Sequence, residues 1–331
     1  MLGPRDYRGL YSIIPTPTLP DATFGPGEPT VDLEETARVV DELVRAGSSG
    51  IIALGTTGEC ATIPSWEYEP LVRCLCETVA GRIPLFVGAT ALGQAEVMAR
   101  LAVARDAGAD GTLLGMPMWQ PLTTQMAVRY YAAVSEAYPG LSVMVYANQR
   151  AFRFPFDEDD EFWAQVADAA PTVTSAKFSR VGPLLRVLAA TRSRINFLPN
   201  DSSVGKFYEA SPETTTAFWA TSASMGPAPC LAMIKALDDG NKAEADQVAK
   251  DIAWANEPIQ PFIADNKVFS SFNIQIEKLR IEAAGYCQPG PIRPPYDVVP
   301  DEYAVPSCEC GQRWRQLCEK YASSDAEAGT K

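Results

Sequence analysis

The chain has 331 residues, which is enough for one large α/β domain or two small ones. Its 28 Lys and Arg residues are outnumbered by 41 Asp and Glu residues, and the net charge of −13 argues against a nucleic-acid partner or an anionic membrane surface. The absence of histidine excludes Ser-His-Asp and Cys-His catalysis and His-ligated metal sites. Proton transfer therefore has to come from Tyr, Lys, Glu, Asp, water or a substrate group.

Cysteine spacing and the N-terminal sequence bear on cofactors and location. No spacing among the eight cysteines matches a zinc ribbon or a CxxC redox pair. Cys308, Cys310 and Cys318 could bind a metal, but reduced thiols near a C-terminal helix are the better interpretation. Residues 1–11 carry charges and no apolar signal-peptide segment, and no apolar run is long enough to span a bilayer. We therefore expect a cytoplasmic protein with no membrane partner and no metal.

Short apolar segments alternate with segments of helical spacing along most of the chain. The predicted strands are residues 10–17, 50–54, 84–88, 111–115, 141–146, 172–177, 195–198 and 215–220. The predicted helices between them are residues 30–46, 66–79, 94–107, 123–137, 157–169 and 182–191. This alternation is typical of parallel βαβ units, and eight units fit a (β/α)8 TIM barrel. An open doubly wound sheet is the alternative, although no G-x-G-x-x-G follows the first strand.

The C-terminal quarter has a different pattern. We predict that residues 1–240 form the barrel and that residues 241–331 form a helical extension and tail packed on it. Extra helices are expected over residues 243–285, followed by a Pro-rich extended segment over residues 288–306. A last helix is expected around residues 312–321.

One predicted strand ends in a lone lysine, Lys177. Burial disfavours the charged form of an amine, and a neutral lysine amine is a nucleophile towards ketones. A surface lysine at a strand end is the ordinary explanation for Lys177 alone. The residues at the other strand ends, described next, favour a catalytic role for Lys177 over a surface position.

In a TIM barrel, catalytic groups lie where the strands end and the following loops begin. Thr56 and Thr57 follow the second strand between Gly55 and Gly58, so backbone amides and hydroxyls there could cradle a carboxylate; a plain tight turn is the alternative. The other candidates at strand ends are Tyr146, Asn200, Trp219 and Ser222. Tyr146 could relay protons and Trp219 could stack on an aromatic substrate, or both could simply pack in the core.

Four motifs in this order carry a family resemblance: Pro15-Thr16-Pro17, Gly55-Thr56-Thr57-Gly58-Glu59, Val145-Tyr146-Ala147-Asn148 and Ala176-Lys177. Together they make residues 10–285 resemble the dihydrodipicolinate synthase/N-acetylneuraminate lyase superfamily of class I pyruvate aldolases. The resemblance implies a TIM barrel, a covalent Schiff base on Lys177 with no dissociable cofactor, and a homotetramer.

A closer resemblance is to the hydratase-aldolases of aromatic-hydrocarbon degradation. It is carried by Gly58-Glu59-Cys60, Gly115 to Trp119, Ala217 to Trp219, Phe272 to Lys278 and the tail Gly290 to Tyr296. Two departures separate the chain from typical dihydrodipicolinate synthases: Met118-Trp119 replaces a tyrosine pair, and Ala151 replaces an arginine. Both departures fit a bulkier and more apolar second substrate.

This resemblance implies conversion of an ortho-substituted benzylidenepyruvate and water to an aromatic aldehyde and pyruvate. We favour an ortho-carboxy substituent over ortho-hydroxy. Arg150, Arg153, Arg180, Ser202 and Lys206 lie in loops that could face the barrel mouth, and a basic one could pair with the second carboxylate; solvated surface charge is the more usual role for each. The implied catalytic residues are Lys177, Tyr146 and Thr56. The predicted substrate-binding residues are Gly55, Thr57, Gly58, Asn200, Trp219, Ser222 and Asn273. Two other activities stay open: a lyase for sugar acids or aliphatic aldehydes, and a non-enzymatic pyruvate-binding regulator.

Overall fold

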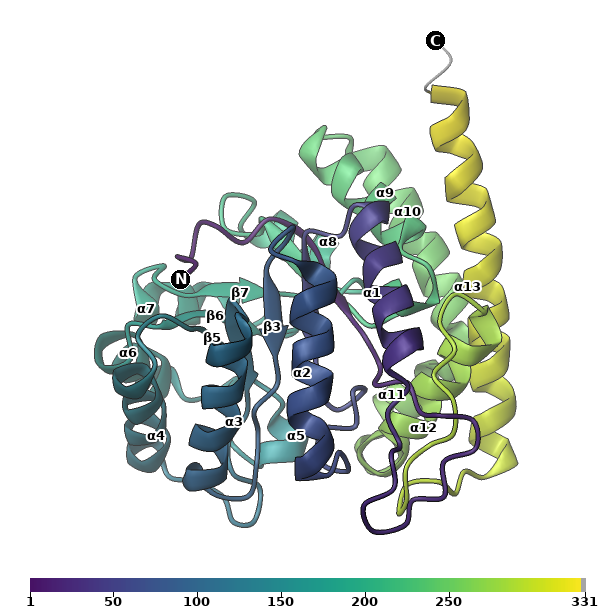
Figure 1. Ribbon diagram of the computed structural model, residues 1–331. Helices are drawn as coiled ribbons and strands as arrows, with labels where there is room; N and C mark the ends of the chain where they lie inside the picture. Colours follow the sequence, from purple (N-terminus) through teal and green to yellow (C-terminus); the bar gives the residue numbers. More distant parts are fainter. Residues whose placement is uncertain (329–331) are drawn as a thin grey trace.

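The computed structural model describes residues 1–328, with side chains as far as residue 322. Its centre is a sheet of eight parallel strands, with helices packed around the outside (Figure 1). The strands are β1 (Gly9–Ile13), β2 (Gly50–Ala53), β3 (Leu85–Val87), β4 (Gly111–Leu114), β5 (Ser142–Tyr146), β6 (Val173–Lys177), β7 (Asn196–Leu198) and β8 (Ala217–Ala220). Nearly every strand residue is buried, as expected for strands covered on both faces.

The strands follow the order β7-β6-β5-β4-β3-β2-β1-β8, so the sheet curls into a barrel. Strands β1 and β8 pair in parallel from Gly9↔Ala217 to Ser12↔Ala220. The remaining gap between β7 and β8 is bridged by the single pair Asn200↔Trp219 and by the bond from the Trp219 amide to the Pro199 carbonyl (2.9 Å). The predicted (β/α)8 TIM barrel is therefore confirmed.

The helices of the barrel alternate with the strands. They are α1 (Leu33–Ala46), α2 (Ser65–Val79), α3 (Gln94–Ala107), α4 (Thr124–Ala137), α5 (Gln149–Phe152), α6 (Asp160–Ala169), α7 (Leu184–Thr191) and α8 (Val204–Ala210). Local sequence explains their ends: α1 begins where the Asp32 carboxylate accepts from the Glu35 amide (2.9 Å) and ends at Gly47 with a φ of 106°. The short helices α5 and α8 lie in loops where no helix was predicted.

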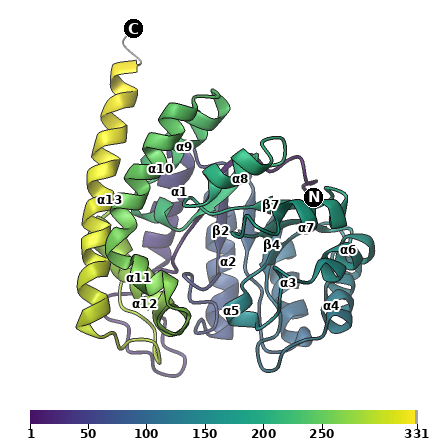
Figure 2. The same ribbon diagram turned by 180° about the vertical axis from the view of Figure 1, so that it is seen from behind.

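The C-terminal helices cover one side of the barrel, and α13 runs along its outer edge (Figures 1 and 2). After the 3₁₀ turn η1 (Ser222–Met225) come α9 (Ala228–Asp238), α10 (Lys242–Asn256), η2 (Glu257–Ile259), α11 (Gln260–Ala264), α12 (Asn266–Ala284) and α13 (Asp301–Ala328). Ile252, Ile281 and Trp314 share one hydrophobic cluster with Leu10 and Ile51 of the barrel. The extension is thus packed on the barrel, while a boundary at residue 240 stays a prediction.

The Pro-rich tail differs in part from the prediction. Residues 286–300 form no helix or strand, but α13 already begins at Asp301 and includes Pro306. Pro306 falls in the second turn and has no N–H to donate to the Glu302 carbonyl, which is a cost of this position. The start of the helix is held by the amides of Tyr303 and Ala304, which bond to the Pro300 carbonyl (2.9 and 3.0 Å). The expected extended structure over residues 301–306 was therefore wrong.

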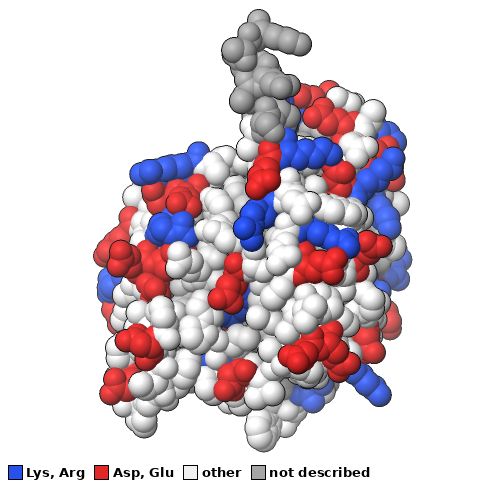
Figure 3. All heavy atoms as spheres, turned by 90° about the vertical axis from the view of Figure 1, so that its right-hand side faces the viewer, with Lys and Arg blue, Asp and Glu red and all other residues white. Residues whose placement is uncertain are grey.

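On the face that carries α13, acidic and basic side chains are interspersed over the surface (Figure 3). No helix within residues 1–328 is long and apolar enough to cross a membrane.

Candidate active site

A cavity of about 640 Å³ opens at the carboxyl ends of β5, β6, β7 and β8, beneath α11 and α12. Its lining includes six of the ten predicted site residues: Thr57, Tyr146, Lys177, Asn200, Trp219 and Asn273. The cavity therefore lies at the end of the barrel where TIM-barrel enzymes carry out their chemistry.

Lys177 is the last residue of β6 and is half-buried at the cavity. It pairs in register with Tyr146 of β5, and paired residues of neighbouring strands point to the same face of a sheet. Its Nζ lies 3.9 Å from the centroid of the Trp219 ring and 4.6 Å from that of the Tyr146 ring. No carboxylate in the described part of the chain pairs with this amine. The electron-rich faces of these two aromatic rings are therefore the groups nearest to Nζ that can stabilise a positive charge.

The Tyr146 hydroxyl is the centre of a small hydrogen-bond network. It lies 2.9 Å from Thr56 Oγ1, and it accepts from Asn148 Nδ2 at 3.2 Å. Phe152 packs edge-on against the Tyr146 ring, with centroids 5.5 Å apart. The hydroxyl is therefore fixed beside Lys177, with one partner that can either give or take a proton.

The turn from Gly55 to Glu59 is tightly closed on itself. The Glu59 amide donates to the Thr56 carbonyl (2.9 Å), and the Gly58 carbonyl accepts from Thr16 Oγ1 (2.7 Å). A Cβ on Gly58 would lie 2.7 Å from the Leu54 backbone nitrogen, so only glycine fits. Within residues 1–328 the Thr56 and Thr57 amides donate to no protein acceptor, which leaves both available to an anionic ligand.

The junction of β7 and β8 fixes the Trp219 ring. The Trp219 indole Nε1 donates to the Leu198 carbonyl at 3.1 Å, and the backbone of Trp219 bridges to Asn200. The side chain of Asn200 accepts in turn from Ser203 Oγ. Closure of the barrel therefore also sets the position of the ring over Lys177.

Helix α12 brings further polar groups to the cavity. Its backbone is kinked at Phe272 (φ −124°, ψ 17°), and Asn273 follows directly. Glu277, four residues later on the same face, pairs with Arg280 (2.6 Å), which also donates to Asn256 Oδ1 (3.1 Å). All four of these polar residues line the cavity. Only one oxygen of Glu277 is used by these contacts.

Three of the predicted substrate-binding residues lie outside the cavity lining. Ser222 is fully buried, and its hydroxyl donates to Asp201, which does line the cavity. Gly55 and Gly58 contribute the shape of the turn and are absent from the lining. Thr56 reaches the cavity through its bond to Tyr146.

The basic residues at the rim divide into two groups. Arg150 and Arg180 line the cavity, as does Ser202, whereas Arg153 turns away to the Met118 and Trp119 carbonyls. Lys206 is exposed and also lies outside the lining. Arg180 is paired with Asp157 (3.1 Å). Among the described residues, Arg150 contacts only neutral groups: Asn266 Oδ1, the Ile263 carbonyl and the Phe269 ring.

The described residues contain no group of three or more His, Cys, Asp or Glu side chains arranged to hold a metal ion. In the C-terminal cluster, Cys310 donates to Asn256 Oδ1 (3.5 Å) and Cys318 to the Gly226 carbonyl (3.5 Å). Both contacts are those of protonated thiols, and burial raises the pKa of each.

Comparison with known proteins identifies the family. The model for the dihydrodipicolinate synthetase family matches residues 19–151. A trans-O-hydroxybenzylidenepyruvate hydratase-aldolase from Pseudomonas aeruginosa is 38% identical over 323 residues, which cover 96% of this chain and 95% of that protein. The chain belongs to the dihydrodipicolinate synthetase family.

Two further similarities place the chain near one branch of the dihydrodipicolinate synthetase family. A trans-2′-carboxybenzalpyruvate hydratase-aldolase from Nocardioides sp. (strain KP7) is 36% identical over 97% of each chain. The solved structure described as "PhdJ bound to substrate intermediate" has a TM-score of 0.92 and 33% identity, and the match covers 97% of this chain and 99% of that one.

Several polar residues of the cavity were given no role from the sequence, among them Asn148, Gln149, Asn256, Glu277 and Arg280. Asn148 lies two residues after Tyr146, at the end of β5, so its position at a strand end could have identified it from the sequence. Glu277 lies four residues after Asn273, which is the spacing of one helix face, but only the fold shows which face meets the barrel.

Proposed function

We propose that this protein is a Schiff-base hydratase-aldolase. The chain is a lyase that cleaves a carbon–carbon bond, converting an ortho-substituted benzylidenepyruvate and water to an aromatic aldehyde and pyruvate. The substrate we favour is trans-2′-carboxybenzalpyruvate, which would give 2-carboxybenzaldehyde. The observation that carries the proposal is the Lys177 amine, which stands at the cavity between two aromatic rings with no carboxylate to pair with among the described residues.

In the first step, the neutral Lys177 amine attacks the substrate ketone, a proton delivered through Tyr146 lets the former ketone oxygen leave as water, and a C=N bond forms. The resulting iminium is positively charged and would lie where the structure places Nζ, over the two rings. The Trp219 ring, 3.9 Å from Nζ, would stabilise this charge by about 0.5–2 kcal/mol. The iminium is conjugated with the alkene and draws electrons away from the benzylic carbon.

In the following steps, a water molecule adds to the benzylic carbon, and the enamine that forms takes a proton to restore the iminium. Loss of the new hydroxyl proton then breaks the carbon–carbon bond, releases the aldehyde and returns the electron pair to an enamine. Protonation and hydrolysis of the enamine release pyruvate and the free amine. One water leaves and two are taken up, so the balance is one water consumed without net oxidation or reduction.

The remaining roles follow from the geometry at the cavity. The Thr56 and Thr57 amides, with the Thr56 hydroxyl, would hold the substrate carboxylate. Tyr146 would pass protons to and from the substrate through its bond to Thr56 (2.9 Å). Asn273 and the free oxygen of Glu277 share one face of α12 and would orient the water that adds to the alkene.

Arg150 is the residue we propose for the ortho substituent. It lines the cavity and lacks a carboxylate partner within the described residues, so a second substrate carboxylate would complete its contacts. Ortho-hydroxy is the alternative substituent. It is favoured by Gln149, which lines the cavity and whose buried Oε1 has no hydrogen-bond donor in the described part of the chain. That oxygen is suited to accept from a hydroxyl group.

These alternatives are separated by kinetics with the two arylidenepyruvates. We expect wild type to prefer the ortho-carboxy compound, and Arg150→Met to lower its kcat/KM by about tenfold, or about 1.4 kcal/mol, while leaving the ortho-hydroxy compound unchanged. Arg153→Met is the matched control, because Arg153 belongs to the same loop but points away from the cavity and donates to the Met118 and Trp119 carbonyls. A tenfold preference of wild type for the hydroxy compound would identify that compound as the substrate.

A further inference from the structure

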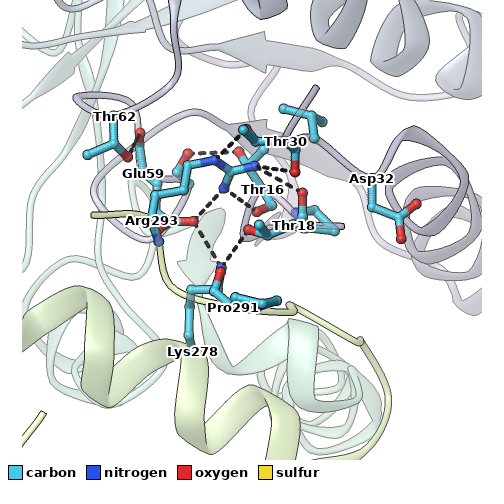
Figure 4. Close-up of polar contacts among 12 residues, drawn as sticks. Thr16, Thr18, Thr30, Asp32, Glu59, Thr62, Lys278, Pro291 and Arg293 are labelled. Atoms are coloured by element: carbon cyan, nitrogen blue, oxygen red, sulfur yellow. Dashed lines mark hydrogen bonds and ion pairs between the residues drawn. The ribbon is translucent and has the colours of Figure 1, made fainter. Parts of the chain in front are cut away.

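The C-terminal tail reaches back to the turn that is proposed to bind the substrate carboxylate. Arg293 of the tail and Lys278 of α12 converge on Glu59, the last residue of the turn from Gly55 to Glu59 (Figure 4). The three side chains are almost completely excluded from solvent, with exposed fractions of 0% for Glu59 and 2% for each cation. None of the three lines the cavity of the candidate active site.

Both oxygens of Glu59 are occupied by this contact. Oε1 accepts from the Arg293 amide (2.8 Å), and Oε2 accepts from Arg293 Nη1 (2.6 Å) and Lys278 Nζ (3.0 Å). Burial lowers the pKa of both Lys278 and Arg293, and the Glu59 carboxylate opposes each shift. Both cations are thus held charged against burial by the same carboxylate.

Arg293 also ties the turn to the N-terminal segment that surrounds it. Each of its five guanidinium N–H groups donates a hydrogen bond. Apart from the bond to Glu59, the acceptors are the carbonyls of Thr16, Pro17 and Thr30 and the Thr30 hydroxyl, at 3.0–3.3 Å. Thr16 in turn donates to the Gly58 carbonyl, so the guanidinium group supports the turn from both sides.

The turn needs this support because its backbone is strained. Leu54 and Glu59, which flank its four central residues, both have positive φ values, 57° and 52°. A left-handed conformation costs a residue with a side chain about 1–2 kcal/mol, and it persists only where the surroundings hold it. Thr56, at the middle of the turn, carries the hydroxyl that bonds to Tyr146. A change in the position of Glu59 would therefore move both the free amides and this hydroxyl.

We propose that Arg293 is a positioning residue for the reaction, and that it acts through Glu59 to keep the Thr56-Thr57 turn in the conformation that binds the substrate carboxylate. This inference rests on the proposed function, because it assumes that the turn binds a carboxylate and that Lys177 forms the imine. The tail, which lies outside the barrel, is then a working part of the active site. Loosening the turn weakens carboxylate binding more than it slows the chemistry on Lys177, since preorganised donors contribute mainly to binding.

The test combines pyruvate-dependent borohydride trapping with steady-state kinetics, well below the melting temperature of every variant. For Arg293→Met we expect the half-saturating pyruvate concentration and the KM for the arylidenepyruvate to rise by about tenfold, with a smaller fall in kcat. The yield of reduced adduct at saturating pyruvate should stay at the wild-type level. Arg293→Lys keeps a charge beside Glu59 but loses most of the other donors, so its values should fall between those of wild type and Arg293→Met.

Arg38→Met is the matched control. Arg38 also anchors the tail, through its bond to the Tyr286 carbonyl (2.7 Å), but it does not contact the turn. Its variant should lose thermal stability and keep the wild-type pyruvate dependence.

Four outcomes overturn parts of the proposal. A folded Arg293→Met enzyme with unchanged pyruvate dependence, or equal rises in Arg38→Met, would show that Arg293 is only structural. If Arg293→Met does not fold, a wild-type pyruvate dependence in Arg293→Lys would likewise show that Arg293 is only structural. The absence of any adduct in wild type would instead overturn the proposed function, and this inference with it.

Discussion

At the scale of single residues, the site depends on the surroundings of Lys177 and Tyr146. The two side chains are paired across β5 and β6, so they share the inner face of the barrel. The aromatic rings near the lysine suit both the ammonium and the iminium, while the tyrosine hydroxyl is held between Thr56 and Asn148. This division supports the covalent role proposed for the lysine and the proton-transfer role proposed for the tyrosine.

The role of Tyr146 can be tested by removing its hydroxyl. We expect Tyr146→Phe to lower kcat by about 10²-fold or more, with a much smaller change in KM, because proton transfer through a positioned group contributes that much to the rate. Steady-state kinetics measures both constants. Tyr130→Phe is the matched control, since Tyr130 is buried and donates to the Gly115 carbonyl (3.1 Å) away from the cavity. Its loss should cost about 1 kcal/mol of stability and leave kcat unchanged. A Tyr146→Phe enzyme with normal kcat would assign Tyr146 a packing role only.

Part of the site could be predicted at this scale because the barrel fixes where functional groups must lie. Tyr146, Lys177, Asn200 and Trp219 were found as residues at strand ends, and the structure brings all four to one cavity. Ser222 also follows a strand, but in η1 its side chain is fully buried and bonds to Asp201 of the cavity lining instead of lining the cavity itself. Strand position alone does not reveal where the backbone of a loop sends a side chain.

At the scale of elements, the tail joins parts of the chain that are far apart in sequence. The Glu35 carboxylate on α1 accepts from the Gln288 amide of the tail (2.7 Å) and pairs with Arg38 (2.6 Å). Close by, Gly290 has a φ of 65°, and a Cβ there would lie 2.0 Å from the Thr18 carbonyl oxygen. The tail backbone can therefore approach the N-terminal segment closely at Gly290, and this approach places Arg293 beside the turn.

The contact between α1 and the tail should make stability depend on pH. Burial alone would raise the pKa of the Glu35 carboxyl, but the bonds from Arg38 and the Gln288 amide outweigh it and leave the pKa below its ordinary value of 4.5. In the acid range the unfolded chain then binds more protons than the folded chain, so the stabilisation is complete above pH 4.5 and is lost as pH falls through the folded-state pKa.

We therefore expect Glu35→Gln to lower the melting temperature near neutral pH, and the difference from wild type to shrink as the pH falls below the unfolded-state pKa of 4.5. Thermal unfolding followed at a series of pH values measures this difference. Glu34→Gln is the control, because Glu34 lies in the same helical turn but is exposed. A pH-independent difference between Glu35→Gln and wild type would contradict the account.

Long regular elements were easier to predict than short or proline-containing ones. The eight strands were found because each is a short apolar run between helices of clear periodicity. Helices α5 and α8 have only four and seven residues, which is too few to establish a helical period. Pro306 hid the true start of α13, since proline usually marks a helix boundary. The burial of Arg293 depends on contacts with residues more than 200 positions away, which no local pattern reports.

At the scale of the whole molecule, the barrel, the helical extension and the tail act on the same cavity. The strands supply Lys177 and its aromatic neighbours, α12 supplies Asn273 and Glu277, and the tail holds the turn that carries Thr56 and Thr57. If the proposed function holds, the C-terminal residues are part of the active site, and we expect truncation before the tail to damage substrate binding as well as stability.

The homotetramer implied by the family resemblance stays a prediction.

The central claim is that Lys177 forms an imine with the substrate ketone, and borohydride reduction in the presence of pyruvate tests it most directly. The account predicts a stable adduct that peptide mass spectrometry locates on Lys177, and no adduct there in Lys177→Met. Lys206→Met is the control, because Lys206 is exposed and lies outside the cavity, and this variant should trap normally. A folded wild-type enzyme that gives no adduct, or that gives one on another lysine, would contradict the mechanism assigned to Lys177.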